Sequence, residues 1–498
     1  GGTSTTGVSE YGFDYGMSGA WYTISNGIGT FFLAMLFAKL YRSLNSVTVP
    51  GIIEKFFGVK ARSVSSVLLT IVMLAVGLSQ MVAAGKLGES LLGVPFIYSV
   101  VGFAVIFIVY TLAGGMNAVE KTNKIHLFVM YGGAIIGVIF AVMKLGGFGE
   151  MKTYLTTVSP ETVSAIEDAG KTVDAVNRTS GGGYFGMLTI GFSKVSSWVI
   201  ASLLGACTAQ AGIQPVLAAK DVNTAKKASI ITAIVCAPFG IFTALIGIAA
   251  KALFNKGELL YDKSGALING KSALPSLMMN IHANPTVSGI VGGIILASIL
   301  AAILSTVSPI ILASGTMVTK DLYQRVLKPK ATDKEVLKMS RVTTAISGVI
   351  CTLGAIALVD ASAVLDIVYA AYSLRGAIFV IVLLGIYWKK ASEKGACWSM
   401  VLTGAVAIFW KVFQIATAVT EKVPNESGKL ISKVLLEGHY PITIGAEIVP
   451  KQIGDKLYNA VVGGFAITET YAAVIVALVA TLVFSLVFPK KDSPLKRA

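Results

Sequence analysis

The chain consists largely of apolar stretches long enough to cross a lipid bilayer as helices. Eleven such stretches are centred near residues 30, 78, 104, 135, 203, 240, 302, 350, 378, 406 and 478, and a helix needs about 20 apolar residues to span the hydrocarbon core. Only 13% of the residues are charged, against about 25% in soluble domains. No stretch alternates polar and apolar residues as a transmembrane strand does. The sequence therefore predicts an all-α, multi-pass membrane protein with a single domain, residues 1–498.

Charged residues are unevenly distributed between the two sides that this threading creates. Segments 39–62, 114–124, 215–227, 320–341, 389–394 and 489–498 fall on one side. They hold more than half of the 41 lysines and arginines but under a third of the 26 acidic residues. Cytoplasmic loops carry such an excess of basic residues, so we expect these segments and the C-terminus to be cytoplasmic and the protein to lie in the cell (inner) membrane. The net charge of +15 then reflects topology, and no nucleic-acid partner is expected.

The first seven residues, GGTSTTG, are a poor start for a buried helix. Glycine weakens a helix, and serine and threonine compete for backbone hydrogen bonds. In the predicted orientation the span centred near residue 30 enters the membrane from outside, so residues 1–16 belong to the outer end of a preceding span. We interpret this stretch as the middle of an interrupted helix, with its inner half and one earlier span lacking.

A second stretch, between Ser202 and Pro215, has the same character, because small and polar residues interrupt a span that Pro215 then stops. Four complete spans separate the two interruptions, so each opens a unit of five spans with opposite orientation. We predict a five-plus-five inverted repeat, with halves 1–145 and 191–389, an extracellular loop at 146–190 and two accessory C-terminal spans in 390–498. Secondary transporters use such broken helices to hold substrate and ions at the midplane. The alternative is that small residues merely allow close helix packing.

Adjacent hydroxyls, Ser305 and Thr306, lie deep in the apolar stretch AILSTVSP. Na⁺ prefers oxygen ligands, which hydroxyls and carbonyls supply where no carboxylate is near. Together with the carbonyl of Ala302, one turn earlier, these hydroxyls form a candidate sodium site. The alternative is that both hydroxyls bond back to carbonyls of their own helix.

Arg375, in YAAYSLRGAIF, is the one basic residue that the threading places near the bilayer core. A charge there is costly and marks a candidate functional site. The planar guanidinium suits a carboxylate bound through two hydrogen bonds. The alternatives are an internal partner, for which Asp366 is the best candidate although it lies nine residues away, or a shallower position from which the side chain reaches the membrane surface.

Two glutamines, Gln80 and Gln210, also fall within spans. We treat both as candidate substrate ligands, with hydrogen bonding between helices as the alternative. The four cysteines fall at unrelated spacings in apolar stretches, which indicates neither a disulfide framework nor a metal site. Acid–base groups and metal ligands do not converge within the spans, which argues against a membrane enzyme.

Five segments resemble, in the correct order, segments of the sodium:solute symporter family. They are SVTVPGIIEKFFG at 46–58, YTLAGGMNAVEKTNKIH at 110–126, the pattern Q-x-x-x-Q-x-x-L-A-A-K at 210–220, LAAILSTVSPIILASGTMVTKDLY at 300–323 and LLGIYWKKASEKGA at 383–396. The resemblance extends over essentially the whole chain. It implies the LeuT-type inverted-repeat fold and the import of organic solutes on the inward Na⁺ gradient by alternating access.

The resemblance also assigns roles to individual positions. It implies sodium binding at Ala302, Ser305 and Thr306, with further ligands on carbonyls that would precede Gly1. The residues alone favour hydroxyls that bond back to their own helix. The resemblance favours sodium binding instead, because these three positions match the sodium site that the family carries on its eighth core span.

Substrate-binding positions follow from the same comparison. Ser4, Thr23 and Ser202 fall where sugar-binding members carry polar and acidic residues. Thr23 stands where the family's sugar transporter has a glutamate, which argues against a hexose. Arg375, taken with Tyr372 and with the hydroxyls of residues 3–6, which include Thr5, favours a small carboxylate or amino acid.

We therefore predict a Na⁺-coupled secondary active symporter that imports a small anionic or zwitterionic organic solute across the lipid bilayer. Na⁺ is the one cofactor expected, as the coupling ion. The alternatives are a sugar or vitamin symporter of the same family, a channel, and a transporter-fold sensor or receptor that does not transport.

Overall fold

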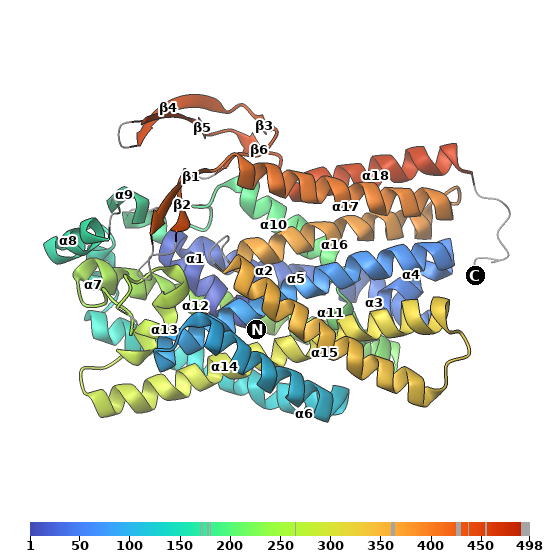
Figure 1. Ribbon diagram of the computed structural model, residues 1–498, viewed down its shortest axis with the longest axis horizontal. Coiled ribbons are helices and arrows are strands. Elements are labelled where there is room, and N and C mark those ends of the chain that lie inside the picture. The colour runs from blue at the N-terminus through green and yellow to red at the C-terminus, as the bar shows by residue number, and fades with distance from the viewer. Residues whose placement is uncertain are drawn as a thin grey trace.

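The eleven predicted spans are present. The computed structural model describes residues 1–489 except 170, 172, 177–178, 180, 264, 360–363, 425–429, 437 and 454–455. Within these residues ten helices are long and apolar enough to cross a membrane, and a bent pair, Phe192–Thr208 with Gln210–Ala218, makes an eleventh span. The spans pack side by side along the long axis of the molecule (Figure 1).

Most spans are long α-helices, and several contain short π- or 3-10 segments. In chain order the helices are η1 (Thr3–Gly7), α1 (Val8–Tyr15), η2 (Gly16–Ala20), α2 (Trp21–Phe32), η3 (Leu33–Phe37), α3 (Ala38–Ser43), α4 (Val49–Phe57), α5 (Val59–Leu92), α6 (Phe96–Leu145), α7 (Phe148–Tyr154), α8 (Pro160–Asp168), α9 (Val173–Val176), η4 (Gly181–Phe185), α10 (Phe192–Gly205), η5 (Ala206–Thr208), α11 (Gln210–Ala218), α12 (Val222–Lys256), α13 (Gly270–Met279), α14 (Pro285–Met317), η6 (Val318–Leu327), α15 (Asp333–Leu358), α16 (Val364–Tyr387), α17 (Glu393–Ala416) and α18 (Glu469–Val487). Helix α6 carries two spans, Phe96–Gly114 and Thr122–Leu145.

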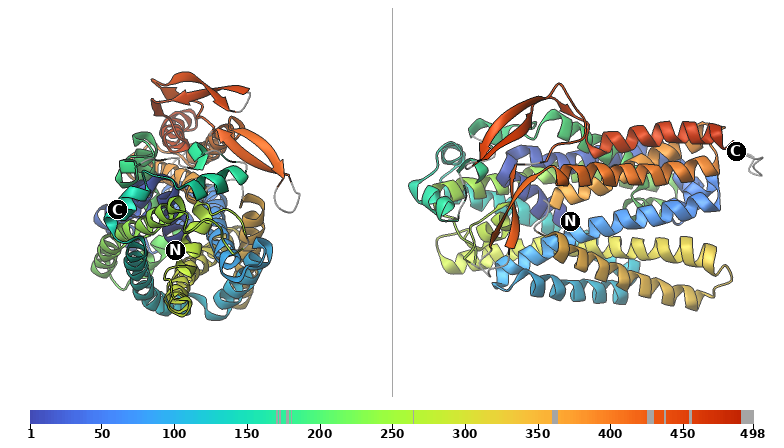
Figure 2. Two further views of the ribbon diagram at one scale, coloured as in Figure 1. Left: turned by 90° about the vertical axis from the view of Figure 1, so that its left-hand side faces the viewer. Right: turned by 45° about the horizontal axis from the view of Figure 1, so that its top comes forward.

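The two ends of the bundle differ in character. We call the end formed by residues 39–62, 215–227, 320–341 and 389–394 the basic end, and the opposite end, which carries α7, α8, α13 and the strands, the loop end. Helix α18 finishes at the basic end, whereas the N-terminus lies midway along the bundle (Figures 1 and 2). Residue 1 therefore stands at mid-depth, as the sequence predicts.

The chain turns back on itself after its first helix. Gly16 ends α1 with φ 72° and ψ −145°, a conformation that costs glycine little and other residues much. A β-carbon at this position would also lie against the backbone of Tyr184. Because of this turn α1 runs toward the loop end and α2 runs back from it, and both pack against α12.

The loop between α17 and α18 adds short strands to the predicted helical bundle. It forms three antiparallel strand pairs, in which β1 (Val419–Pro424) pairs with β2 (Leu430–Leu436), β3 (Thr443–Ile444) with β6 (Phe465–Ala466), and β4 (Glu447–Ile453) with β5 (Lys456–Val462). These strands lie outside the helical bundle at the loop end (Figure 2). The spans themselves are helical, because a helix satisfies every backbone polar group inside lipid.

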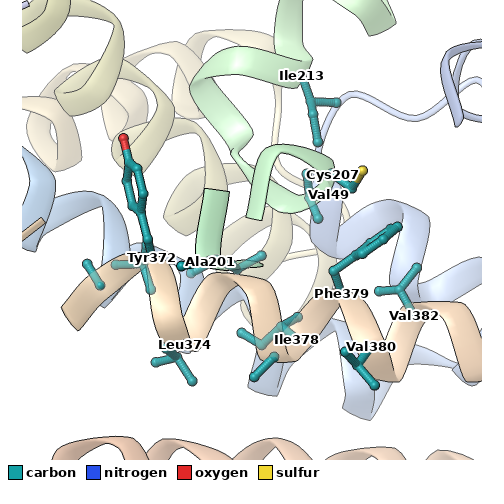
Figure 3. Packing of buried hydrophobic residues seen from close by; sticks show 14 of the residues in the cluster. Val49, Ala201, Cys207, Ile213, Tyr372, Leu374, Ile378, Phe379, Val380 and Val382 are labelled. Carbon is teal, nitrogen blue, oxygen red and sulfur yellow. The ribbon is translucent and has the colours of Figure 1, made fainter. Parts of the chain in front are cut away.

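Buried apolar side chains form two clusters within the bundle. One of them includes Ala201, Cys207 and Ile213 of the bent pair together with Ile378 and Phe379 of α16 (Figure 3). Large apolar side chains on the outer faces of the spans stay exposed, Phe128 by 78%. This distribution is typical of a protein surrounded by lipid.

Candidate solute and cation site

A cavity of about 920 Å³ lies between the start of η1 and the break that separates α10 from α11. At mid-depth it is lined by Gly1, Gln80, Tyr372 and Arg375, together with residues of α14. From there it extends along α11 and the start of α12 to the basic end, where its lining includes exposed residues such as Pro215, Ala218 and Thr224. The cavity therefore opens at the basic end.

The second interruption is a true break in the helix. Helix α10 ends at Gly205, η5 adds one tight turn, and Ala209 adopts φ −73° and ψ 92° before α11 begins. The two halves are bent by 43°. The hydroxyl of Thr208 donates to the carbonyl of Arg375 at 2.6 Å, which fixes the break against α16. Residues 3–7 differ, because they form a π-helical turn that runs on into α1.

Arg375 is buried at the wall of this cavity, with 4% of its surface exposed. Its guanidinium carbon lies 3.6 Å above the ring centroid of Tyr372, and its Nε has no hydrogen-bond partner in the described part of the chain. Asp366 does not serve as its partner, which corrects that alternative, because the carboxylate pairs with Lys194 at 3.3 Å. The Arg375 guanidinium therefore lines the cavity and rests on the ring of Tyr372.

Tyrosines and serines of three helices form a hydrogen-bonded cluster beside Arg375. The hydroxyls of Tyr22 and Tyr372 lie 3.2 Å apart, and both residues line the cavity. Behind them the hydroxyl of Ser25 contacts that of Ser202 at 2.9 Å and that of Tyr369 at 3.1 Å. Ser202, a predicted substrate ligand, is fully buried in this second layer. It therefore supports the cavity wall from behind.

The three predicted sodium ligands converge on one point of α14. The hydroxyls of Ser305 and Thr306 both donate to the carbonyl of Ala302, at 2.8 and 3.2 Å. Both side chains line the cavity, and a β-carbon added at Gly1 would collide with the Thr306 hydroxyl. Both hydroxyls thus lie within hydrogen-bond distance of the same carbonyl, in the back-bonded arrangement named as the alternative, and Thr306 lies beside the start of η1. Such a set suits a cation once the two hydroxyl protons turn away.

Gln80 of α5 joins this site to the start of η1. Its Oε1 accepts a hydrogen bond from the backbone N–H of Thr3 at 3.3 Å, and its Nε2 donates to the hydroxyl of the same residue. Both residues line the cavity. The amide therefore links α5 to the start of η1.

Ser4 and Thr5 are placed beside the site and bond to their own helix. The hydroxyl of Ser4 donates to the carbonyl of Gly1 at 2.8 Å, and the hydroxyl of Thr5 donates to the carbonyls of Gly1 and Gly2 at 3.2 and 3.1 Å. Neither residue is among the described residues that line the 920 Å³ cavity. Thr3, which belongs to the predicted group of hydroxyl residues 3–6, does line the cavity.

Thr23 and Gln210 are turned away from the cavity. The hydroxyl of Thr23 donates to the carbonyl of Ala237 and accepts from the N–H of Gly240, both at 2.9 Å. Gln210 accepts from the N–H of Val49 at 2.7 Å and donates to the carbonyl of Val47 at 3.2 Å. In the described structure both side chains form these hydrogen bonds with the backbone of other elements. They therefore act as contacts between elements and not as cavity-lining ligands.

Beyond the cavity, ion pairs join α4, α5 and η6 at the basic end. Arg325 bonds Glu54 at 3.0 Å through its Nε, and Arg62 contacts both Glu54 and Asp321. Partial burial alone would raise the pKa of Glu54, but hydrogen bonds and charge from Arg325 and Arg62 hold it below its ordinary value. The helix that carries the candidate cation ligands is therefore tied at its basic end to α4 and α5.

A broken helix that flanks a mid-membrane cavity is the arrangement of secondary transporters. The sequence profile of the sodium:solute symporter family matches residues 1–404. The chain belongs to this family, and its homologues are transporters rather than enzymes.

Relatives of known activity support this placement. The chain is 25% identical over 434 residues to the high-affinity proline transporter PutP of Bacillus subtilis (strain 168), which covers 84% of this chain and 83% of the relative. It is 26% identical over 419 residues to the sodium/glucose cotransporter of Vibrio parahaemolyticus, covering 82% and 75%. A Na⁺-coupled sialic acid symporter in a substrate-bound outward-open state shares the fold, with a TM-score of 0.66 and 16% identity over 98% of this chain and 87% of that one. The predicted fold class is confirmed, and the internal inverted repeat stays a prediction.

Proposed function

We propose that this protein imports a small carboxylate or amino acid together with Na⁺ by alternating access. The observation that carries the proposal is the position of Arg375, whose guanidinium faces the cavity with no acidic partner among the described residues. Burying a charge without a partner is costly. A carboxylate that enters the cavity would supply the missing partner through two charge-assisted hydrogen bonds.

The coupling ion is proposed to bind at Ala302, Ser305 and Thr306. Each hydroxyl donates to the Ala302 carbonyl, and rotation of the two hydroxyl groups would turn their oxygen lone pairs toward an ion without movement of the helix backbone. Thr306 also contacts the start of η1 at Gly1. Na⁺ at this position would tie α14 to η1, which favours one of the two conformations of the transporter.

The proposed orientation of the protein in the membrane rests on the charge asymmetry of the loops. Basic loops face the cytoplasm, and the cavity opens at the basic end, so we assign the structure to an inward-open state. In this assignment Na⁺ favours the outward-open state, solute closes the outer side, and loss of Na⁺ to the cytoplasm releases both.

The test is a thermal-shift screen of the purified protein with carboxylates, amino acids and sugars, each with and without Na⁺. We expect stabilisation by a carboxylate that requires Na⁺ and is lost in Arg375→Gln. Arg341→Gln removes an exposed arginine of α15 and serves as the matched control. Stabilisation by a sugar that survives Arg375→Gln would overturn the substrate class in favour of a sugar symporter.

Transport itself is tested by uptake into proteoliposomes with an inward Na⁺ gradient. Uptake of the stabilising solute should saturate and should stop when choline replaces Na⁺. Binding without uptake would instead identify a sensor, and uptake that does not saturate would identify a channel.

A further inference from the structure

Three polar side chains from three helices meet on the loop-end side of the cavity. The Tyr11 hydroxyl of α1 donates to Oδ1 of Asp366 at 2.7 Å, and Nζ of Lys194 lies 2.8 Å from the Tyr11 hydroxyl and 3.3 Å from the same carboxylate oxygen. The ammonium also sits 5.0 Å from the Tyr11 ring centroid. Each of the three residues therefore contacts both of the others.

Helix α16 connects this cluster to the solute site. Asp366, Tyr369, Tyr372 and Arg375 follow one another at intervals of three residues, so each lies beside the next in a stripe that winds around α16 by about 60° per step. Tyr369 stacks on Trp198 of α10, with ring centroids 4.3 Å apart and an interplanar angle of 6°. The stripe passes from the ion pair, through the aromatic stack, to the cation that faces the cavity.

The cavity ends at this stripe. Tyr372 and Arg375 line it, whereas among the described residues Tyr369, Trp198 and Asp366 do not. Trp198 and Tyr369 are each 2% exposed. The path from the cavity to the loop end is therefore closed first by the aromatic stack and then by the cluster of Tyr11, Lys194 and Asp366.

We propose that Tyr11, Lys194 and Asp366 form the latch of the outer gate. The latch holds α1, α10 and α16 together while the cavity is open at the basic end, and it parts when the loop end opens. This role rests on the alternating access of the proposed function. It goes beyond that function by naming the contact that opposes outward opening.

The surroundings of the ion pair suit a contact that forms and breaks repeatedly. The side chains of Lys194 and Asp366 each retain 27% exposure, so water can solvate both charges as soon as they separate. An ion pair at such a boundary contributes little net free energy. A deeply buried pair would resist separation much more strongly, because each charge would be left without a partner.

The latch is tested by measuring how fast a thiol behind it is labelled from the loop-end side. Ser202→Cys provides the thiol, in a chain whose four natural cysteines, Cys207, Cys236, Cys351 and Cys397, are replaced by alanine. Ser202 is fully buried and is bonded through Ser25 to Tyr369 of the aromatic stack, so a membrane-impermeant cationic thiol reagent should label it slowly. In Na⁺-free buffer, Asp366→Asn and Lys194→Gln should each raise the labelling rate about fivefold or more, the shift produced by roughly 1 kcal/mol.

The combined variant Asp366→Asn, Lys194→Gln should label no faster than either single variant, because both changes break the same contact. Glu89→Gln is the control, since it removes an ion pair of 2.6 Å with Lys86 within helix α5. Tyr11→Phe keeps the ring and removes the hydroxyl, and it provides a third variant if Asp366→Asn fails to fold.

Two results would overturn the latch. Unchanged labelling in Lys194→Gln and Tyr11→Phe, with or without a loss of thermal stability, would reduce the cluster to a structural contact. Equal acceleration by Glu89→Gln would show a general loosening of the bundle. The measurement requires no solute and no uptake. The labelling rates can therefore be interpreted even if the proposed transport activity is not found.

Discussion

A β-carbon added at Gly205 would lie 2.7 Å from Nε of Arg375 and 3.4 Å from its Cζ. The guanidinium is thus held between the backbone at the end of α10 and the ring of Tyr372 on α16. The absence of a side chain at Gly205 allows the cation to lie directly against the helix break. The position of the candidate solute ligand therefore depends on two helices at once.

Gly205→Ala should displace the guanidinium without harming the fold. The backbone of Gly205 has φ −67° and ψ −25°, which alanine adopts readily. We expect the affinity for a carboxylate solute to fall about tenfold or more, because a bidentate charge-assisted contact loses its geometry. Isothermal titration with Na⁺ present measures this change.

The neighbouring glycine of α16 provides the control for that experiment. A β-carbon at Gly376 would meet Leu204 and Ala201 at 3.4 and 3.5 Å, which are ordinary contacts. Gly376→Ala should therefore bind solute as the unmodified protein does. Equal affinities in all three proteins would show that Arg375 does not contact the solute.

Thr306→Val should weaken coupling to Na⁺ while preserving the shape of the side chain. If the hydroxyl binds the ion, the Na⁺ concentration for half-maximal stabilisation should rise about tenfold or more. Thr316→Val is the matched control, because Thr316 lies on the same helix and its hydroxyl donates to the carbonyl of Leu312, one turn earlier, at 2.8 Å. A similar Na⁺ requirement in both variants would reduce the Thr306 hydroxyl to a bond within its own helix.

Glu54→Gln should remove a pH-dependent part of the stability. Charge and hydrogen bonds from Arg325 and Arg62 outweigh burial and lower the pKa of Glu54 from its ordinary value of 4.5. A carboxyl whose pKa is depressed by folding stabilises the protein above its unfolded-state pKa, and this contribution is lost as the pH falls through the folded-state value. We expect the unmodified protein to melt at a higher temperature than Glu54→Gln at pH 7.

That difference in melting temperature should shrink as the pH is lowered below 4.5. Arg325→Gln removes one of the two partners of Glu54. At pH 7 its melting temperature should therefore lie below that of the unmodified protein by less than that of Glu54→Gln does. A gap between the unmodified protein and Glu54→Gln that stays constant from pH 7 to pH 3 would contradict the ionic role of this contact.

The spans could be predicted from the sequence because lipid allows few alternatives to a helix. The break after Gly205 was also visible, since small residues and Thr208 follow one another in an apolar stretch, but Pro215 lies within α11 and does not stop the span as predicted. The strand pairs between 419 and 466 were missed. They are short elements in a loop with nearly balanced charge, and no bilayer constrains their composition.

The candidate site was predictable only in part. Arg375 and Ser305 stand out because polar groups are rare in apolar helices, and both line the cavity. A polar residue within a span shows that a partner is needed, but helix rotation decides which partner it meets. Thr23 was predicted to face solute and instead faces the backbone of α12. Tyr22 was missed because its sequence gives no sign that its hydroxyl meets Tyr372.

Gln210 offers a direct comparison between a structural amide and a solute ligand. Its side chain is fully buried and bonds the backbone on either side of Thr48, at Val47 and Val49. Gln210→Ala leaves the Val49 N–H without its partner, so the free energy of unfolding should fall by about 2 kcal/mol. The affinity for solute should stay within about twofold in the folded fraction, because such a change is well below 1 kcal/mol.

Gln214 lies one turn further along α11, partly exposed, and Gln214→Ala should change neither quantity. Chemical denaturation followed by tryptophan fluorescence measures the stability, and titration calorimetry measures the binding. If Gln210→Ala loses solute affinity while its stability matches that of Gln214→Ala, the amide contacts solute in another conformation of the transport cycle.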